Sequence, residues 1–295
     1  MWLLLLAALN TASAADWLSI QGAESSDPDK AKPRVTAFVQ VAAEGFVARP
    51  VEGLTSDALA PYNGEVASFN RAAGSSGPFA LSLRRVRVGG RGVVPNTDGL
   101  ASGSFAIELG QNALTATAHG WSPRLMDASI SLHGPFGVHL RLGQFKLPLS
   151  DESLEAVHVT GDLVRATNVT GRLLMERDAT SGAYIGPVNG FRDVGAELFG
   201  GHLVGKLEVS WAVMASNGST NMARTEPGVD GTARVQLSHL YGGKRRSAQR
   251  DELSVWVFGA TGKRRVAEVT ARRTRLGSGA QLQRDGLRLR TEVIV

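Results

Sequence analysis

The sequence contains no cysteine, little proline and no long hydrophobic run. Its 295 residues include 0 Cys and 11 Pro beside 35 Gly. The absence of cysteine excludes disulfide frameworks, thiol nucleophiles and cysteine metal sites. No stretch reaches the ~18 consecutive apolar residues that a membrane-spanning helix needs. With 43% hydrophobic residues, we still expect a folded chain, and this balance of glycine and proline suits many short strands with tight turns.

Motifs for catalysis and metal binding are also lacking. There is no Gly-x-Ser-x-Gly elbow. The six histidines are scattered and form no His-x-x-x-His pair. Residues 259–264 contain Gly and Lys but lack the spacing and the Ser or Thr of a phosphate loop. We therefore expect neither an enzyme nor a metal centre, and no cofactor.

The first 14 residues resemble a secretory signal peptide. Residues 2–9 form a short apolar run, and residues 12–14 place small side chains at the spacing that a signal peptidase needs, although no Lys or Arg precedes the run. Residues 15–33 are polar, which predicts a flexible N-terminus. Export disfavours a nucleic-acid partner, so the net charge of +5 indicates acidic lipid or small anions instead.

The clearest strand pattern lies in residues 138–150. Val138 and Leu142 point to one side of a strand, and His139 and Arg141 point to the other. Pro148 cannot donate a ladder hydrogen bond, so the chain leaves the sheet there. Acidic side chains directly after Ser150 indicate a short helix rather than a carboxylate pair for catalysis.

The same alternation recurs along the rest of the chain. A turn at 134–137 predicts one hairpin, glycines at 200–201 predict another, and the Arg84–Arg85 doublet predicts a bulge. Residues 151–190 lack strand alternation and form a long excursion. The candidate strands, about 10–12 in number because the last ones are weaker, are residues 35–47, 79–88, 102–109, 114–119, 125–132, 138–145, 193–199, 203–213, 232–239, 253–258, 268–276 and 287–295.

Such strands fit either a soluble β-sandwich or a membrane barrel. No composition shift marks a domain boundary, so residues 34–295 are predicted to form one all-β domain. A membrane barrel alternates apolar outward and polar inward positions in segments of ~10 residues. The continuous apolar faces, the mixed polar faces and the predicted export favour a transmembrane antiparallel β-barrel.

Several ordered motifs resemble the phosphate-selective porin O and P family. Residues 142–150, Leu-Gly-Gln-Phe-Lys-Leu-Pro-Leu-Ser, are similar to its "G-Q-F-K-x-P-F-S" signature, and residues 191–195, Phe-Arg-Asp-Val-Gly, are similar to its "G-R-D-I-G". The similarity spans about residues 80–236. It implies a sixteen-stranded, trimeric outer-membrane barrel that conducts phosphate or related anions, with an inward constriction loop near residues 151–190.

We therefore expect a porin in the Gram-negative outer membrane, in contact with lipid and lipopolysaccharide. Two alternatives remain open: a non-conducting barrel that serves as an anchor or scaffold, and a soluble periplasmic β-sandwich that binds an anion. The expected pore-lining residues are Arg141, His139, Lys206, Arg234 and Arg84, and the constriction loop is expected to start at Lys146, Pro148 and Ser150.

Overall fold

The structure is a computed structural model of the whole chain. It describes residues 17–18, 33–45, 52–53, 63–64, 79–109, 123–155, 176–177, 184–185, 191–218, 228–242, 250–266 and 269–295. The predicted signal peptide (1–14) and the candidate strand 114–119 lie outside the described residues. Within the described parts, no helix is long or apolar enough to cross a membrane.

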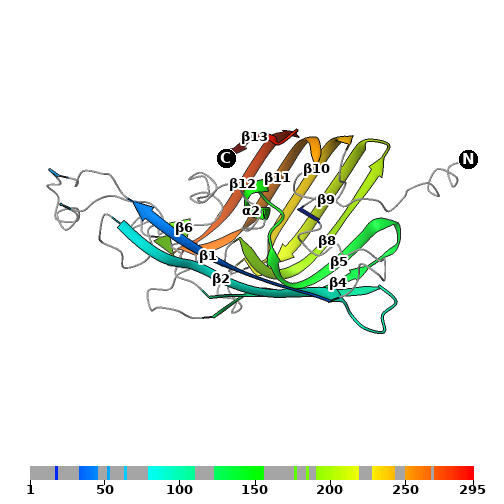
Figure 1. Cartoon of the computed structure of the whole chain (residues 1–295), viewed down its shortest axis with the longest axis horizontal. Coiled ribbons are helices and arrows are strands. Elements are labelled where there is room, and N and C mark those ends of the chain that lie inside the picture. Colours follow the sequence, from blue (N-terminus) through cyan, green and yellow to red (C-terminus); the bar gives the residue numbers. More distant parts are fainter. Residues whose placement is uncertain are drawn as a thin grey trace, which may run out of the picture.

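Among the described residues, eleven antiparallel strands form one sheet in chain order (Figure 1). The all-β prediction is confirmed, and eleven strands lie within the predicted range. A separate two-stranded sheet pairs β6 (Glu176–Arg177) with β7 (Tyr184–Ile185). The strands of the large sheet are β1 (Arg34–Gly45), β2 (Phe79–Val93), β3 (Ala101–Leu109), β4 (Arg124–His133), β5 (Val138–Lys146), β8 (Arg192–Val204), β9 (Leu207–Ser216), β10 (Asp230–Gly242), β11 (Asp251–Val266), β12 (Val269–Arg284) and β13 (Leu287–Ile294).

The two faces of the sheet have the reverse of the usual polarity. On β10, Arg234 and Gln236 are 1% and 4% exposed, whereas the alternating Val235 and Leu237 are 44% and 42% exposed. The neighbouring β9 and β11 follow the same rule, with Ser210 and Ser254 buried. A strand directs successive side chains to opposite faces, so this sheet has a polar inner face and an apolar outer face.

The connections also differ between the two ends of the sheet. One end carries the short turns 94–100, 134–137, 205–206 and 285–286, together with residues 243–250. The other end carries the long connections 46–78, 110–123, 147–191 and 217–229, and one short turn at 267–268. Short turns at one end and longer loops at the other are typical of outer-membrane barrels.

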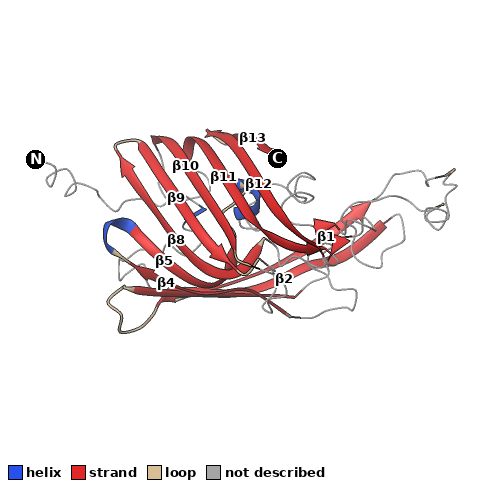
Figure 2. Cartoon of the chain, turned by 180° about the vertical axis from the view of Figure 1, so that it is seen from behind, coloured by secondary structure: helices blue, strands red, loops and turns tan. Residues whose placement is uncertain are grey.

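The sheet curves around the short helix α2 (Asp151–Leu154). Figure 1 and Figure 2 view this curve from opposite sides, with the helix on the concave side of the sheet. Strands β1 and β13 form the two ends of the strand order. The inner face therefore curves around residues 147–155, which directly follow β5.

Two local predictions have different outcomes. The bulge is confirmed, because Gln40 pairs with Arg85 while Val41 pairs with Leu83, which leaves Arg84 as the extra residue. The second hairpin is confirmed by the pairing of β8 with β9, but the placement of its turn at 200–201 is wrong, because β8 continues to Val204 and the turn is formed by residues 205–206. An added Cβ on Gly200 would lie 2.7 Å from the Gly137 carbonyl oxygen and 3.3 Å from the Trp211 ring, so this glycine makes room for the backbone of one neighbouring segment and the side chain of another.

Candidate functional site on the inner face

The inward segment, residues 147–155, leaves the end of β5 and crosses the inner face. Its start is held to β8 because the Leu147 amide donates to the Phe191 carbonyl oxygen at 2.8 Å. Pro148, which follows, is buried and has no amide hydrogen to pair. The predicted departure from the sheet at this proline is confirmed by the end of β5 at Lys146.

Helix α2 forms where the acidic residues predict it. Ser150 is its N-cap, and the Ser150 hydroxyl accepts a hydrogen bond from the Ser153 amide at 3.2 Å. Asp151 and Glu152 occupy the first turn, where negative charge interacts favourably with the helix dipole. At the other end, the Lys146 ammonium donates to the carbonyl oxygens of Leu154 and Glu155 at 3.0 and 2.6 Å. A cation on these last carbonyls holds the helix to β5.

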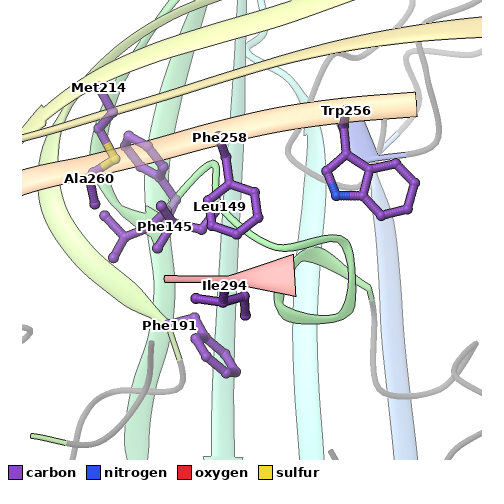
Figure 3. Packing of buried hydrophobic residues seen from close by; sticks show 9 residues of the cluster. Phe145, Leu149, Phe191, Met214, Trp256, Phe258, Ala260 and Ile294 are labelled. Carbon is purple, nitrogen blue, oxygen red and sulfur yellow. The ribbon is translucent and has the colours of Figure 1, made fainter. Parts of the chain in front are cut away.

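Apolar contacts hold the start of the inward segment. Leu147 and Leu149 belong to a buried cluster whose other members come from four strands and from the residue before β8 (Figure 3). This cluster closes the space between the segment and β11 with aromatic rings. Its members outside the inward segment are Phe145, Phe191, Met214, Trp256, Phe258, Ala260 and Ile294.

Arg234 is the main polar contact between β10 and the inward segment. Its guanidinium donates to the Leu149 carbonyl oxygen at 2.5 Å and to the Asp151 carboxylate at 3.1 Å. A third bond joins it to the side-chain oxygen of Gln236 at 2.7 Å. The guanidinium carbon also lies 5.1 Å from the centre of the Trp256 ring, within cation–π range. The sequence placed Arg234 on the polar face, and the structure shows it binding the inward segment there.

Strand β13 supplies a second set of polar contacts to α2. Arg290 lies 3.5 Å from the Asp151 carboxylate and 3.2 Å from that of Glu155, and Arg288 also pairs with Glu155. The Asp151 amide donates to Glu292 at 3.2 Å. The inward segment is therefore fixed to three strands that are far apart in the sequence: β5, β10 and β13.

Arg141 lies on the inner wall of β5. It is 3% exposed, and it donates to the hydroxyls of Ser129 at 3.0 Å and Ser104 at 3.4 Å. Its guanidinium lies 4.6 Å from the centre of the Phe145 ring. In the register of β5 and β8, Arg141 is opposite Glu197. The predicted inward direction of this side chain agrees with these contacts.

The rest of the inner wall carries paired charges of both signs. Arg192 binds both carboxylate oxygens of Asp127 at 2.8 and 2.9 Å. Arg250 lies 2.6 Å from the Glu208 carboxylate. Such pairs offset the cost of burying each charge alone, so the wall is strongly polar while many of its charges are locally balanced.

The other predicted site residues lie in different places. His139 faces inward at the short-turn end, where its Nδ1 atom is 2.9 Å from Nδ1 of His133, and its ring lies against Phe199. Lys206 is exposed in the two-residue turn between β8 and β9 and does not reach the contacts described above. Arg84 is the bulge residue of β2, and its side chain lies outside the described residues.

Of the residues that hold the inward segment, Arg234 and Lys146 were predicted from the sequence, whereas the residues of β13 and Gln236 were not. Glu292 and Arg290 lie on a strand with a weak alternation pattern. Glu292 is 141 residues beyond its partner Asp151. Gln236 lies two residues after Arg234 and therefore on the same face of the strand. This shared face was the one feature of the sequence that placed Gln236 beside Arg234. Among the described residues, no group of three or more His, Asp or Glu is arranged to hold a metal ion.

Comparisons with known proteins find structural likeness at a distance and no likeness in sequence. No family model matches the sequence, and no curated protein matches it. Among solved structures, the anion-selective porin from Comamonas acidovorans aligns with a TM-score of 0.39 and 16% identity, covering 89% of this chain and 78% of that chain.

Proposed function

We propose that the protein is an outer-membrane porin through which small anions diffuse. The observation that carries this proposal is the reversed polarity of the sheet. Its outer face exposes side chains such as Val235 and Val255, while Arg234 and Ser254 are buried on the inner face. An apolar exterior around a polar interior fits a sheet surrounded by lipid and does not favour a soluble β-sandwich.

The arrangement of the connections supports an orientation. Outer-membrane barrels have short periplasmic turns and longer extracellular loops. The end with the turns 205–206 and 285–286 is therefore assigned to the periplasm, and the end from which residues 147–191 leave the sheet is assigned to the outside. In this orientation the inward segment descends from the extracellular side, as a constriction does in a porin.

The preference for anions rests on the basic residues of the inner wall. Arg141 donates to the hydroxyls of Ser129 and Ser104 and lies opposite Glu197, and the whole chain carries a net charge of +5. Inward arginines favour the entry of anions into a narrow polar pore. Phosphate is the first solute to test, because residues 142–150 resemble the signature of the phosphate-selective porins. The trimer and the lipopolysaccharide contacts stay predictions from the same resemblance.

Planar bilayer recording tests the proposal directly. The refolded protein, with its folded state checked by heat-dependent migration on a gel, is added to bilayers in potassium chloride and then in potassium phosphate. We expect discrete conductance steps in both salts. A folded and membrane-inserted protein that gives no steps would contradict the porin and identify a non-conducting barrel. Recovery of the folded protein in solution without detergent would contradict the membrane barrel itself.

A further inference from the structure

Two residues near the N-terminus are buried against the inner face of the sheet. Trp17 and Leu18 are 4% and 1% exposed. The indole nitrogen of Trp17 donates to the Ser210 hydroxyl on β9 at 3.2 Å. Both side chains pack in one cluster with Phe199 and Ala212 of the wall. These residues belong to the segment 15–33, whose polar composition predicted flexibility and indicated no such contact.

The same cluster includes a residue of the inward segment. Leu154, the last residue of α2, is fully buried beside Trp17 and Leu18. A hydrophobic contact therefore joins the N-terminal residues to the helix. Because Leu154 and Trp17 are far apart in the sequence, this contact forms only when both segments lie in the interior of the sheet.

Trp17 also contacts the residue that holds the inward segment to β10. The guanidinium carbon of Arg234 lies 5.3 Å from the centre of the Trp17 ring and 5.1 Å from that of Trp256. The same guanidinium binds Leu149 and Asp151 of the inward segment. Two indole rings beside one arginine restrict its side chain and strengthen the attraction in a site with little water.

The wall leaves room for this contact at Gly201. A Cβ added to Gly201 would lie 3.2 Å from a terminal methyl of Leu18, which is closer than an ordinary van der Waals contact. This glycine lies inside strand β8 rather than in a turn. Its small size therefore has a packing reason: it allows Leu18 to approach the strand.

We propose that Trp17 and Leu18 form an N-terminal peg that holds the inward segment in place inside the barrel. The peg fixes Arg234 through Trp17 and fixes α2 through Leu154. The docking of the peg is independent of transport, whereas its effect on conductance rests on the proposed porin function. Loss of the peg should loosen the inward segment and widen the passage.

Cysteine cross-linking tests the docking without requiring conductance. The chain has 0 cysteines, so two introduced thiols have no competitors. The variant Leu18→Cys/Gly201→Cys joins positions that are in contact. The control Leu18→Cys/Lys206→Cys uses a residue in the turn beyond the end of β8. The strand alone places that turn ~10 Å from Gly201, because three residues at ~3.3 Å each lead from Gly201 to Val204. We expect mild oxidation of the folded protein to give a disulfide, detected by mass spectrometry, in the first variant only. Equal reaction in both variants, or in neither, would overturn the peg.

A pair of tryptophan variants tests the effect of the peg on the passage. Trp17→Ala removes the contacts with Arg234 and Ser210, whereas Trp211→Ala removes a ring from the outer face of β9. We expect Trp17→Ala to raise the single-channel conductance and the frequency of transitions between conductance levels, and Trp211→Ala to leave both unchanged. If the wild-type protein conducts and both variants behave like it, the positioning role is wrong. If the wild-type protein does not conduct, the porin proposal fails while the cross-link still decides whether the peg docks.

Discussion

Arg234 should be the residue whose loss most weakens the attachment of the inward segment. The substitution Arg234→Gln removes its hydrogen bonds to Leu149 and Asp151 and its position beside two indole rings. Hydrogen bonds to a charged group contribute about 1.5–3 kcal/mol each, and a desolvated cation–π contact contributes about 2 kcal/mol.

The expected cost of Arg234→Gln is smaller than the sum of these contributions, because contributions that share one side chain are not additive. Breaking a buried ion pair costs about 3–5 kcal/mol because the remaining charge loses its partner. Here Asp151 keeps Arg290 at 3.5 Å and Arg288 at 3.6 Å. We therefore expect a loss of about 3 kcal/mol in the free energy of unfolding. Arg234→Lys retains the charge but not the planar donor geometry, so its loss should be intermediate.

Urea unfolding in detergent micelles, followed by tryptophan fluorescence, measures this loss, because Trp17 and Trp256 lie beside Arg234. The control is Arg284→Gln. Arg284 pairs with Asp285, and the two side chains are 62% and 82% exposed. An exposed pair of this kind contributes about 0–1 kcal/mol. Equal midpoints for Arg234→Gln and Arg284→Gln would refute the assignment of Arg234 as an anchor.

Three further substitutions test other parts of the structure. A Cβ on Gly277 would overlap the Phe258 ring, whereas one on Gly103 would meet only the Ser129 carbonyl oxygen at 3.9 Å. In the same urea assay, Gly277→Ala should lower the free energy of unfolding by about 1–3 kcal/mol, and Gly103→Ala should leave it nearly unchanged. Equal effects of the two substitutions would refute the close packing at Gly277. Val235→Arg places a charge on the outer face within β10 and should lower the free energy of unfolding in lipid vesicles by about 2–4 kcal/mol, while Val229→Arg, just before the strand, should lower it by about 0–1 kcal/mol. If Val235→Arg leaves the free energy of unfolding unchanged, the outer face does not contact lipid. Arg141→Gln should reduce the anion-to-cation permeability ratio in bilayers, and Lys206→Gln should leave it unchanged. A reduction by Lys206→Gln without one by Arg141→Gln would show that Arg141 does not line the pore.

The sequence predicted the strands where alternation is regular. Strand β5 and its hairpin with β4 follow from the alternation around Arg141 and the turn after His133. Helix α2 follows from Ser150 and the acids behind it, since capping is a local effect. These features depend on neighbouring residues, so the pattern in one chain is sufficient to predict them.

The remaining features depend on contacts between distant residues. Gly200 and Gly201 were interpreted as a turn, but they lie within β8 and accommodate Trp211 and Leu18 from other segments. The turn falls instead at Gly205, whose φ of +63° suits glycine. This shift moved Lys206 out of the predicted strand. No local pattern indicates that Trp17 would meet Arg234, or that β13 would bind α2.

The reversal potential of single channels tests the central claim most directly. The refolded protein is inserted into a planar bilayer that separates two potassium chloride solutions differing tenfold in concentration, and the voltage of zero current is measured. We expect a reversal potential shifted toward the equilibrium potential of chloride. A shift toward the equilibrium potential of potassium would contradict an anion-favouring pore.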